Sequence, residues 1–133
     1  MLRILVVDDL LANRIFITEL LMKVFPKFEV IEAKSGREGV KLALNQNPDM
    51  ILLDEYMPEM DGYETARLLG AIPETSKIPI IGMILTESQE WLTSENMRPF
   101  CQALLLKPLS TKNLYMALQR ILGYEIEKNG LYT

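Results

Sequence analysis

The chain has 133 residues, a formal net charge of −4, and 49% hydrophobic residues. This length fits one domain with a sizeable core. No apolar run approaches the ~18 residues of a membrane-spanning helix, and no signal-peptide pattern opens the chain. The lysines and arginines are scattered, unlike the basic stripe that follows a nucleic-acid backbone. Histidine is absent and Cys101 is the only cysteine, which excludes histidine-dependent catalysis, histidine-ligated metals and an internal disulfide framework. We therefore expect a cytoplasmic protein that binds neither membrane nor nucleic acid directly.

The first predicted elements are a buried strand and an amphipathic helix. Ile4 to Val7 is a short β-branched run, typical of a strand buried on both faces. A helix is predicted from about Ala12 to Phe25, closed by Pro26. Its apolar positions, expected to face the core, are Phe16, Ile17, Leu20, Leu21 and Val24. Its polar positions, expected to face away from the core, are Arg14, Glu19 and Lys23.

Three more strands are predicted between residues 28 and 85. Phe28 to Ala33 alternates apolar and polar residues, which indicates a strand near the edge of a sheet, and a helix follows from about Arg37 to Asn45. Met50 to Leu53 is apolar throughout and predicts a strand buried on both faces. After a helix from about Tyr63 to Leu69, Ile78 to Leu85 has the composition of a fourth buried strand.

A fifth strand and a last helix complete the pattern. Leu104 to Leu106 form the strand, Ser110 is a suitable N-cap for the helix, and Gly123 lies just beyond the helix end. Strands that alternate with helices predict right-handed crossovers, and therefore an α/β fold with a doubly wound five-stranded parallel sheet and helices on both faces. We expect one domain over residues 1–123, followed by a tail of residues 124–133.

Four charged side chains follow predicted strands. Asp8 and Asp9 come after the first strand, Asp54 ends the third, and Lys107 ends the fifth. The carboxyl ends of parallel strands share one edge of the sheet, so these side chains should converge in one crevice. Carboxylate oxygens suit Mg²⁺, which would offset their repulsion and let Asp54 act as a nucleophile toward phosphorus. Lys107 would place a positive charge beside the transferred group. Taken alone, the Asp54 stretch also fits a strand that simply ends in a solvated carboxylate.

With these residues the chain resembles the receiver domain of two-component response regulators. The matching motifs lie within residues 2 to 122, in the family's order and spacing: Val6–Asp9, Asp54, Met57-Pro58, Met60–Gly62, Ile78–Ile81 and Leu106–Pro108. The resemblance implies a flavodoxin-like fold in which Asp54 accepts a phosphoryl group from a histidine kinase or phosphotransfer protein. It also implies that Asp9, Asp54 and the backbone carbonyl of Tyr56 hold Mg²⁺. Asp8 would assist, and Lys107 would contact the phosphoryl group. Such a domain modifies itself and is not a turnover enzyme.

Two positions depart from the family pattern. The family usually has Thr or Ser five residues after the proline of the fourth strand, and an aromatic residue three positions before the lysine; these are its switch residues. Ile84 and Leu104 stand at these positions. Thr86 could point the same way as Ile84, but the residues after it read as the start of a helix. Phosphorylation at Asp54 is therefore expected to couple to conformation weakly or differently.

Three functions fit these observations. The first is a phosphorylatable single-domain receiver that signals through protein contacts. The second is a pseudo-receiver that works as a phosphorylation-independent binding or dimerisation module. The third is a Mg²⁺-dependent phosphatase with an aspartyl nucleophile; it is disfavoured because such enzymes carry a second Asp where Tyr56 stands.

The partner surface is also predicted from the resemblance. In the family, the face made by helix four, strand five and helix five contacts an output partner or a second copy. Trp91, Met97 and Phe100 could extend such an apolar surface here. The alternative, which we favour, is that they cover the domain's own core.

Overall fold

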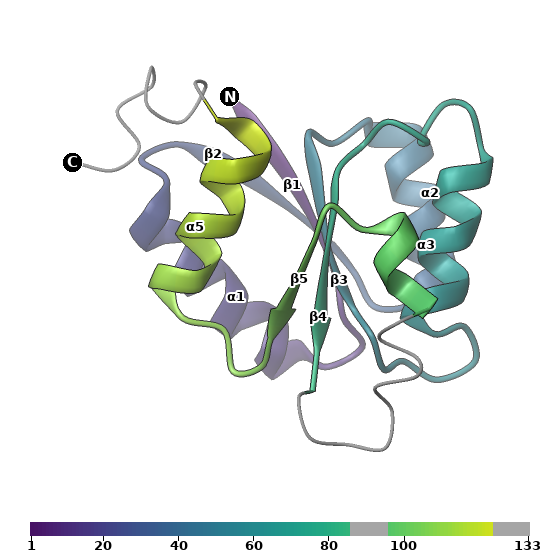
Figure 1. The fold of residues 1–133 in the computed structure, drawn as a ribbon, viewed down its shortest axis with the longest axis horizontal. Helices are drawn as coiled ribbons and strands as arrows, with labels where there is room; N and C mark the ends of the chain where they lie inside the picture. The colour runs from purple at the N-terminus through teal and green to yellow at the C-terminus, as the bar shows by residue number, and fades with distance from the viewer. Residues whose placement is uncertain (86–95, 124–133) are drawn as a thin grey trace.

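A five-stranded parallel sheet forms the middle of the computed structural model, which describes residues 1–85 and 96–123 (Figure 1). The strand order is β2-β1-β3-β4-β5, and every adjacent pair is parallel. The strands are β1 (Leu2–Val7), β2 (Phe28–Ala33), β3 (Met50–Asp54), β4 (Ile80–Ile84) and β5 (Ala103–Leu106). The described helices are α1 (Leu11–Val24), α2 (Gly36–Gln46), α3 (Gly62–Ala71), the short 3-10 helix η1 (Arg98–Phe100) and α5 (Thr111–Leu122).

The helices cover both faces of the sheet. Figure 1 shows α1 and α5 on one side of it and α2 and α3 on the other. The predicted fold class is thereby confirmed. Among the described helices none is long and apolar enough to cross a membrane. Thr86, Trp91 and the expected tail of residues 124–133 lie outside the described residues.

The strand positions follow from hydrophobicity. All residues of β3 and β4 are buried, as expected of continuous apolar runs covered on both faces. β2 pairs only with β1, so the prediction of an edge strand is correct. β4 begins at Ile80, two residues later than predicted, after a proline that has no N–H for a ladder bond. Ser110 caps α5 by accepting from the Asn113 N–H at 3.1 Å, as predicted.

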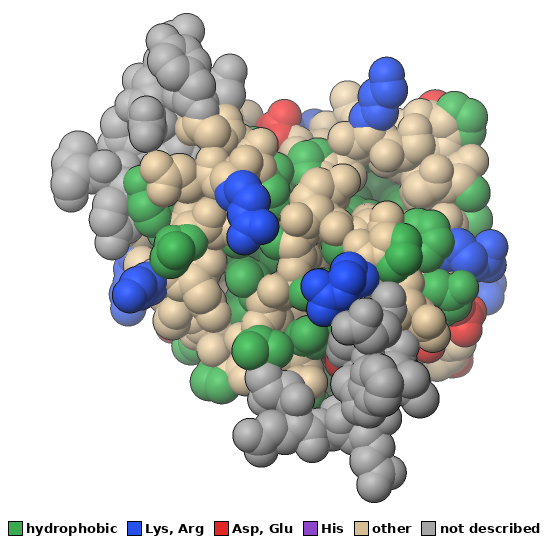
Figure 2. All heavy atoms as spheres, in the orientation of Figure 1, with side chains coloured by type: hydrophobic (Ala, Val, Ile, Leu, Met, Phe, Trp, Pro, Cys, Tyr) green, Lys and Arg blue, Asp and Glu red, His purple; other side chains and the backbone are tan. Residues whose placement is uncertain are grey.

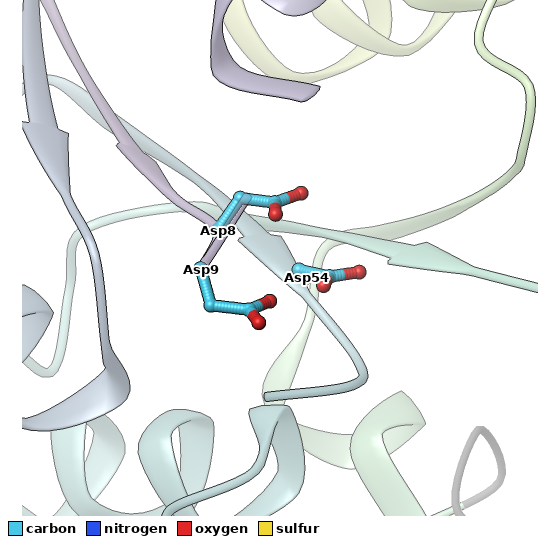
Figure 3. Close-up of side chains that lie close together, drawn as sticks. All are labelled: Asp8, Asp9 and Asp54. Carbon is cyan, nitrogen blue, oxygen red and sulfur yellow. The ribbon is translucent and has the colours of Figure 1, made fainter. Parts of the chain in front are cut away.

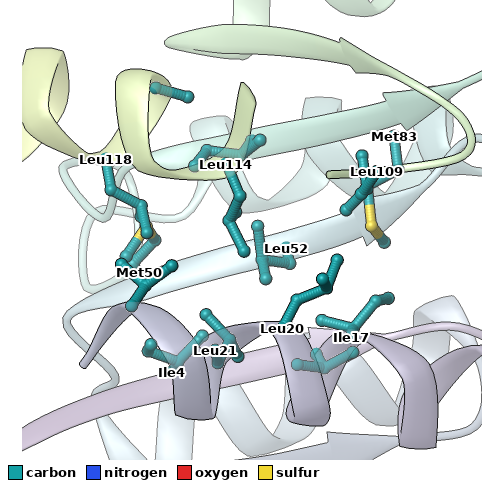
Figure 4. Close-up of a cluster of buried hydrophobic side chains, with 14 of the residues drawn as sticks. Ile4, Ile17, Leu20, Leu21, Met50, Leu52, Met83, Leu109, Leu114 and Leu118 are labelled. Carbon is teal, nitrogen blue, oxygen red and sulfur yellow. The ribbon is translucent and has the colours of Figure 1, made fainter. Parts of the chain in front are cut away.

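Each face of the sheet has its own hydrophobic core. Figure 4 shows the core on the α1 and α5 side, where Leu20, Leu114 and Leu118 point toward Met50 and Leu52 of β3. The second core lies under α2 and α3, and it includes the fully buried Met97 and the partly buried Phe100. These two residues therefore cover the domain's own core, as favoured above.

Two side chains of α1 lie where the sequence analysis did not expect them. Arg14 was expected to face away from the core, but it is only 5% exposed. Its guanidinium donates to the Asp8 carbonyl oxygen at 2.8 Å and to Glu32 of β2 at 2.8 Å, so its charge is paired beneath the helix. Phe16 was expected in the core but is 43% exposed.

Surface charge is dispersed on the face that is visible in Figure 2. There the Lys and Arg side chains lie apart from one another rather than in a continuous patch. This distribution agrees with the scattering of basic residues along the sequence.

Candidate functional site

Three carboxylates and one ammonium group meet at the carboxyl edge of the sheet. Asp8 and Asp9 follow β1, Asp54 is the last residue of β3, and each offers a carboxylate oxygen within 4.8 Å of the others. Figure 3 shows the three side chains extending in the same direction beyond their strands. Lys107, which follows β5, forms an ion pair through Nζ with Oδ1 of Asp54. The parallel topology therefore gathers residues that are far apart in sequence.

The loop after Asp54 is shaped by a close backbone approach. The Gly62 N–H donates to the Glu55 carbonyl oxygen at 2.9 Å. A Cβ at Gly62 would lie 2.5 Å from the Asp54 carbonyl oxygen, so no larger residue fits there without moving the strand end. Asp61 then caps α3 by accepting from the Glu64 N–H at 2.9 Å. Tyr56, whose carbonyl was a predicted metal ligand, lies inside this loop and its side chain is 37% exposed.

Asp8 is held by the start of α1. Its Oδ1 accepts from the Leu10 N–H at 2.9 Å and from the Asn13 side chain at 3.3 Å. The Arg14 guanidinium fixes the Asp8 backbone by donating a hydrogen bond to the Asp8 carbonyl oxygen. The second carboxylate oxygen, Oδ2, is buried and has no hydrogen-bond partner within residues 1–85 and 96–123. An unpaired buried carboxylate oxygen is costly, which leaves one ligand position open to a cation.

The electrostatics of the site favour a cation. Burial raises the pKa of Asp54 from 3.8 to about 6, although the hydrogen bond from Lys107 opposes this shift. Burial likewise raises the pKa of Asp8, against the hydrogen bond from the Leu10 N–H. One ammonium group does not balance three carboxylates, so the site gains from further positive charge.

The two positions that depart from the family pattern, Ile84 and Leu104, lie on β4 and β5. Asp54 pairs with Met83 across the sheet, so Ile84 stands one residue beyond that pair, and it is buried. The Ile84 carbonyl oxygen accepts from the Lys107 N–H at 2.8 Å. Leu104 pairs with Gly82 and packs on the second core. Both side chains are aliphatic, whereas the family pattern has a hydroxyl at the position of Ile84 and an aromatic ring at that of Leu104.

Arg14 is the residue near the site that sequence reasoning missed. A signal was present, because Arg14 lies three residues before Ile17 and seven before Leu21, both of which are buried. That spacing places Arg14 on the core stripe of the helix. The charge of Arg14 led to its assignment to the exposed face, because arginine is seldom buried unless it is paired.

Comparison with known proteins identifies a family. The model of the response regulator receiver domain matches residues 4–119. PilH of Pseudomonas aeruginosa is 34% identical over 123 residues, which cover 92% of this chain and 99% of PilH. YdfI, a transcriptional regulatory protein of Bacillus subtilis, is 35% identical, and here the match covers 85% of this chain but only 51% of the relative.

A solved structure extends the comparison to the site. The receiver domain of sensor histidine kinase PA1611 from Pseudomonas aeruginosa has a TM-score of 0.80 and 29% identity, over 92% of this chain and 98% of that domain. Its crystal structure has a magnesium ion coordinated in the active site cleft. The matches in sequence and in fold agree, and they span most of the chain. The chain therefore belongs to the response regulator receiver domain family of two-component signalling systems.

Proposed function

We propose that this chain is a cytoplasmic receiver, formed by residues 1–123, that accepts a phosphoryl group on Asp54 from a histidine kinase or phosphotransfer protein. The observation that carries the proposal is the position of Asp54. Asp54 is 2% exposed, and its carboxylate pairs with Lys107 and lies within 4.8 Å of the carboxylates of Asp8 and Asp9. A carboxylate held between an ammonium group and a cation site is suited to in-line attack on phosphorus.

The residues present fit a magnesium ion. The open Oδ2 of Asp8 and the clustered carboxylates are hard oxygen donors of the kind that Mg²⁺ prefers. We propose that Asp9, Asp54 and the Tyr56 backbone carbonyl hold the ion, assisted by Asp8. When bound, Mg²⁺ neutralises charge that develops on the transferred phosphoryl oxygens.

The protein's own groups then have distinct tasks. A carboxylate oxygen of Asp54 forms the new bond to phosphorus, and the donor's leaving group departs on the opposite side. Lys107 binds a phosphoryl oxygen through the Nζ that otherwise pairs with Asp54. Arg14 acts through Asp8 and positions its backbone.

We propose that the signal is passed on through protein contacts on the face that includes β5 and α5, to an output partner or a second copy. Ile84 and Leu104 support the alternative of a pseudo-receiver that binds its partner without phosphorylation. The side chain of Ile84 has no hydroxyl with which to bind the phosphoryl group, and Leu104 has no ring to turn inward. Any coupling would therefore use other groups, such as the hydrogen bond between the backbones of Lys107 and Ile84.

The test is intact-mass spectrometry after incubation with acetyl phosphate and Mg²⁺. We expect a gain of one phosphoryl group in the wild type and none in Asp54→Asn. Asp49→Asn is the matched control, because Asp49 is an exposed carboxylate just before β3, at the opposite end of the strand from Asp54. Labelling of Asp54→Asn would show a different acceptor. No gain in folded wild type with excess Mg²⁺ would support the pseudo-receiver.

A further inference from the structure

A pocket adjoins the carboxylate cluster on the α1 side of the sheet. Its volume is about 320 Å³, and it opens between α1, the end of β4 and the segment after β5. Most of its wall is apolar: Phe16, Ile17, Met83, Leu85, Pro108 and Leu109. Asp8, Asn13 and Lys107 form its polar part. The pocket thus has a mostly apolar wall that also includes Asp8 and Lys107 of the candidate phosphorylation site.

The pocket is large enough for a small organic group. An apolar cavity of ~150 Å³ is sufficient for benzene, so this pocket has room for a short aliphatic chain or a ring. Phe16 is 43% exposed and Leu85 is 45% exposed, which leaves large apolar surfaces in contact with water. Covering such surfaces is favourable in proportion to the apolar area removed from water.

The residues that line the pocket indicate which kind of molecule would bind in it. Lys107 lines the pocket and pairs with Asp54, and Asp8 lines it and lies within 4.8 Å of the Asp54 carboxylate cluster. The apolar wall therefore begins beside Lys107 and Asp8, two residues that would flank a phosphoryl group at Asp54. We infer that the pocket binds the apolar leaving group of a small-molecule phosphoryl donor, and that acyl phosphates with about four to six carbon atoms are preferred over acetyl phosphate. This inference rests on the proposed function of Asp54.

The reaction balances without a further reagent. A carboxylate oxygen of Asp54 bonds to phosphorus while the bond between phosphorus and the acyl oxygen breaks. The electron pair of that bond leaves with the fatty carboxylate, which needs no proton because it is a weak base. The chain then carries an aspartyl phosphate, and the carboxylate diffuses from the pocket.

The preference is measured by comparing acetyl, butyryl and hexanoyl phosphate at saturating Mg²⁺. Straight-chain acids are nearly equal in acidity, so their leaving-group chemistry is matched and differences report binding. Full removal of one methylene from water favours binding about fourfold. Because Phe16 and Leu85 are partly exposed, we expect the donor concentration that gives half the maximal labelling rate to fall roughly two- to threefold per added methylene, with little change in the maximal rate itself. Equal half-saturating concentrations for the three donors would overturn the inference.

Variants locate the effect. Phe16→Ala should reduce the ratio of the half-saturating concentrations of acetyl and hexanoyl phosphate at least threefold, because Phe16 lines the pocket. Ile15→Ala is the matched control, since Ile15 is a neighbouring aliphatic residue of α1 that is 50% exposed and is not part of the pocket wall. This control should keep the wild-type ratio. Equal loss in both variants would mean that general surface hydrophobicity, not the pocket, sets the preference.

A non-reactive probe separates this inference from the proposed function. Hexylphosphonate should shift the methyl NMR signals of Ile17, Met83 and Leu109, and methylphosphonate should not. Absence of these shifts would refute the pocket's role even if Asp54 is phosphorylated. Phosphoramidate, which has no apolar part, tests Asp54 independently. If phosphoramidate labels the chain and all acyl phosphates react alike, only this inference fails; if no donor labels it, the proposed function fails.

Discussion

Replacing the proposed acceptor should stabilise the metal-free protein. In Asp54→Asn the side chain keeps nearly the same shape and an oxygen that can accept from Lys107, but it cannot ionise. In the wild type Asp54 is 2% exposed, and burial raises the pKa of its carboxyl from 3.8 to about 6. The folded state thus holds this proton more strongly than the unfolded state does. Ionising Asp54 at neutral pH therefore costs the wild type folding free energy that the variant does not lose.

The magnitude follows from the shift in pKa. About two pKa units correspond to about 3 kcal/mol, since each unit is worth about 1.4 kcal/mol. The stability that the protonated Asp54 gives is fully present below pH ~4 and is lost as the pH rises through about 6. We therefore expect the free energy of unfolding of Asp54→Asn to exceed that of the wild type by about 1–3 kcal/mol at pH 7, and by less at pH 4.

The assay is urea denaturation in the presence of a chelator, from pH 4 to pH 8. Asp49→Asn is again the control, because its exposed carboxylate should give no comparable gain. An Asp54→Asn protein that is no more stable than the wild type at pH 7 would refute the reasoning. So would two stability profiles that run parallel across this pH range.

Three further predictions concern the metal, the loop and the altered switch position. Mg²⁺ at a hundredfold excess over its Kd should raise the free energy of unfolding by about 2.7 kcal/mol, and Asp9→Asn should weaken this stabilisation. Calorimetric melting with and without Mg²⁺ measures the stabilisation, and an unchanged value in Asp9→Asn would exclude Asp9 as a ligand. Gly62→Ala should lower the free energy of unfolding by about 2 kcal/mol or more, because its Cβ would lie 2.5 Å from the Asp54 carbonyl oxygen; wild-type stability in urea would contradict this close approach. Ile84→Thr should strengthen any phosphorylation-dependent change in partner binding or dimerisation, because it restores a hydroxyl next to the cluster; identical phosphorylation-induced NMR shifts in both proteins would argue against a switch role for this position.

The layout of the sheet was predictable because it depends on short-range patterns. The apolar run Met50–Leu53 indicated a central strand, and the alternation in Phe28–Ala33 indicated an edge strand. Once the strands alternate with helices, the handedness rule aligns their carboxyl ends. The meeting of Asp8, Asp54 and Lys107 then follows from topology rather than from any local signal.

The surroundings of the site were less predictable because they depend on partners distant in sequence. Arg14 is buried because Glu32 of β2 pairs with it, and the helical pattern of α1 contains no information on β2. Phe16 has the hydrophobicity of a core residue, yet it lines the wall of an open pocket. That pocket exists only because α1, β4 and the segment after β5 leave space between them, which no single stretch of sequence encodes.

The order in which the site is completed has a consequence for protein synthesis. Lys107, which supplies the positive charge to Asp54, lies 53 residues after it and follows β5, the last strand of the sheet. A ribosome makes the three carboxylates first, so a nascent chain that has completed β4 still lacks the ammonium group that pairs with Asp54. Domains generally fold as units, and the contact between Asp54 and Lys107 joins residues 53 positions apart in the sequence. The ion pair between Asp54 and Lys107 can therefore form only after β5 and Lys107 have been made, whereas Asp8, Asp9 and Asp54 are all present before then.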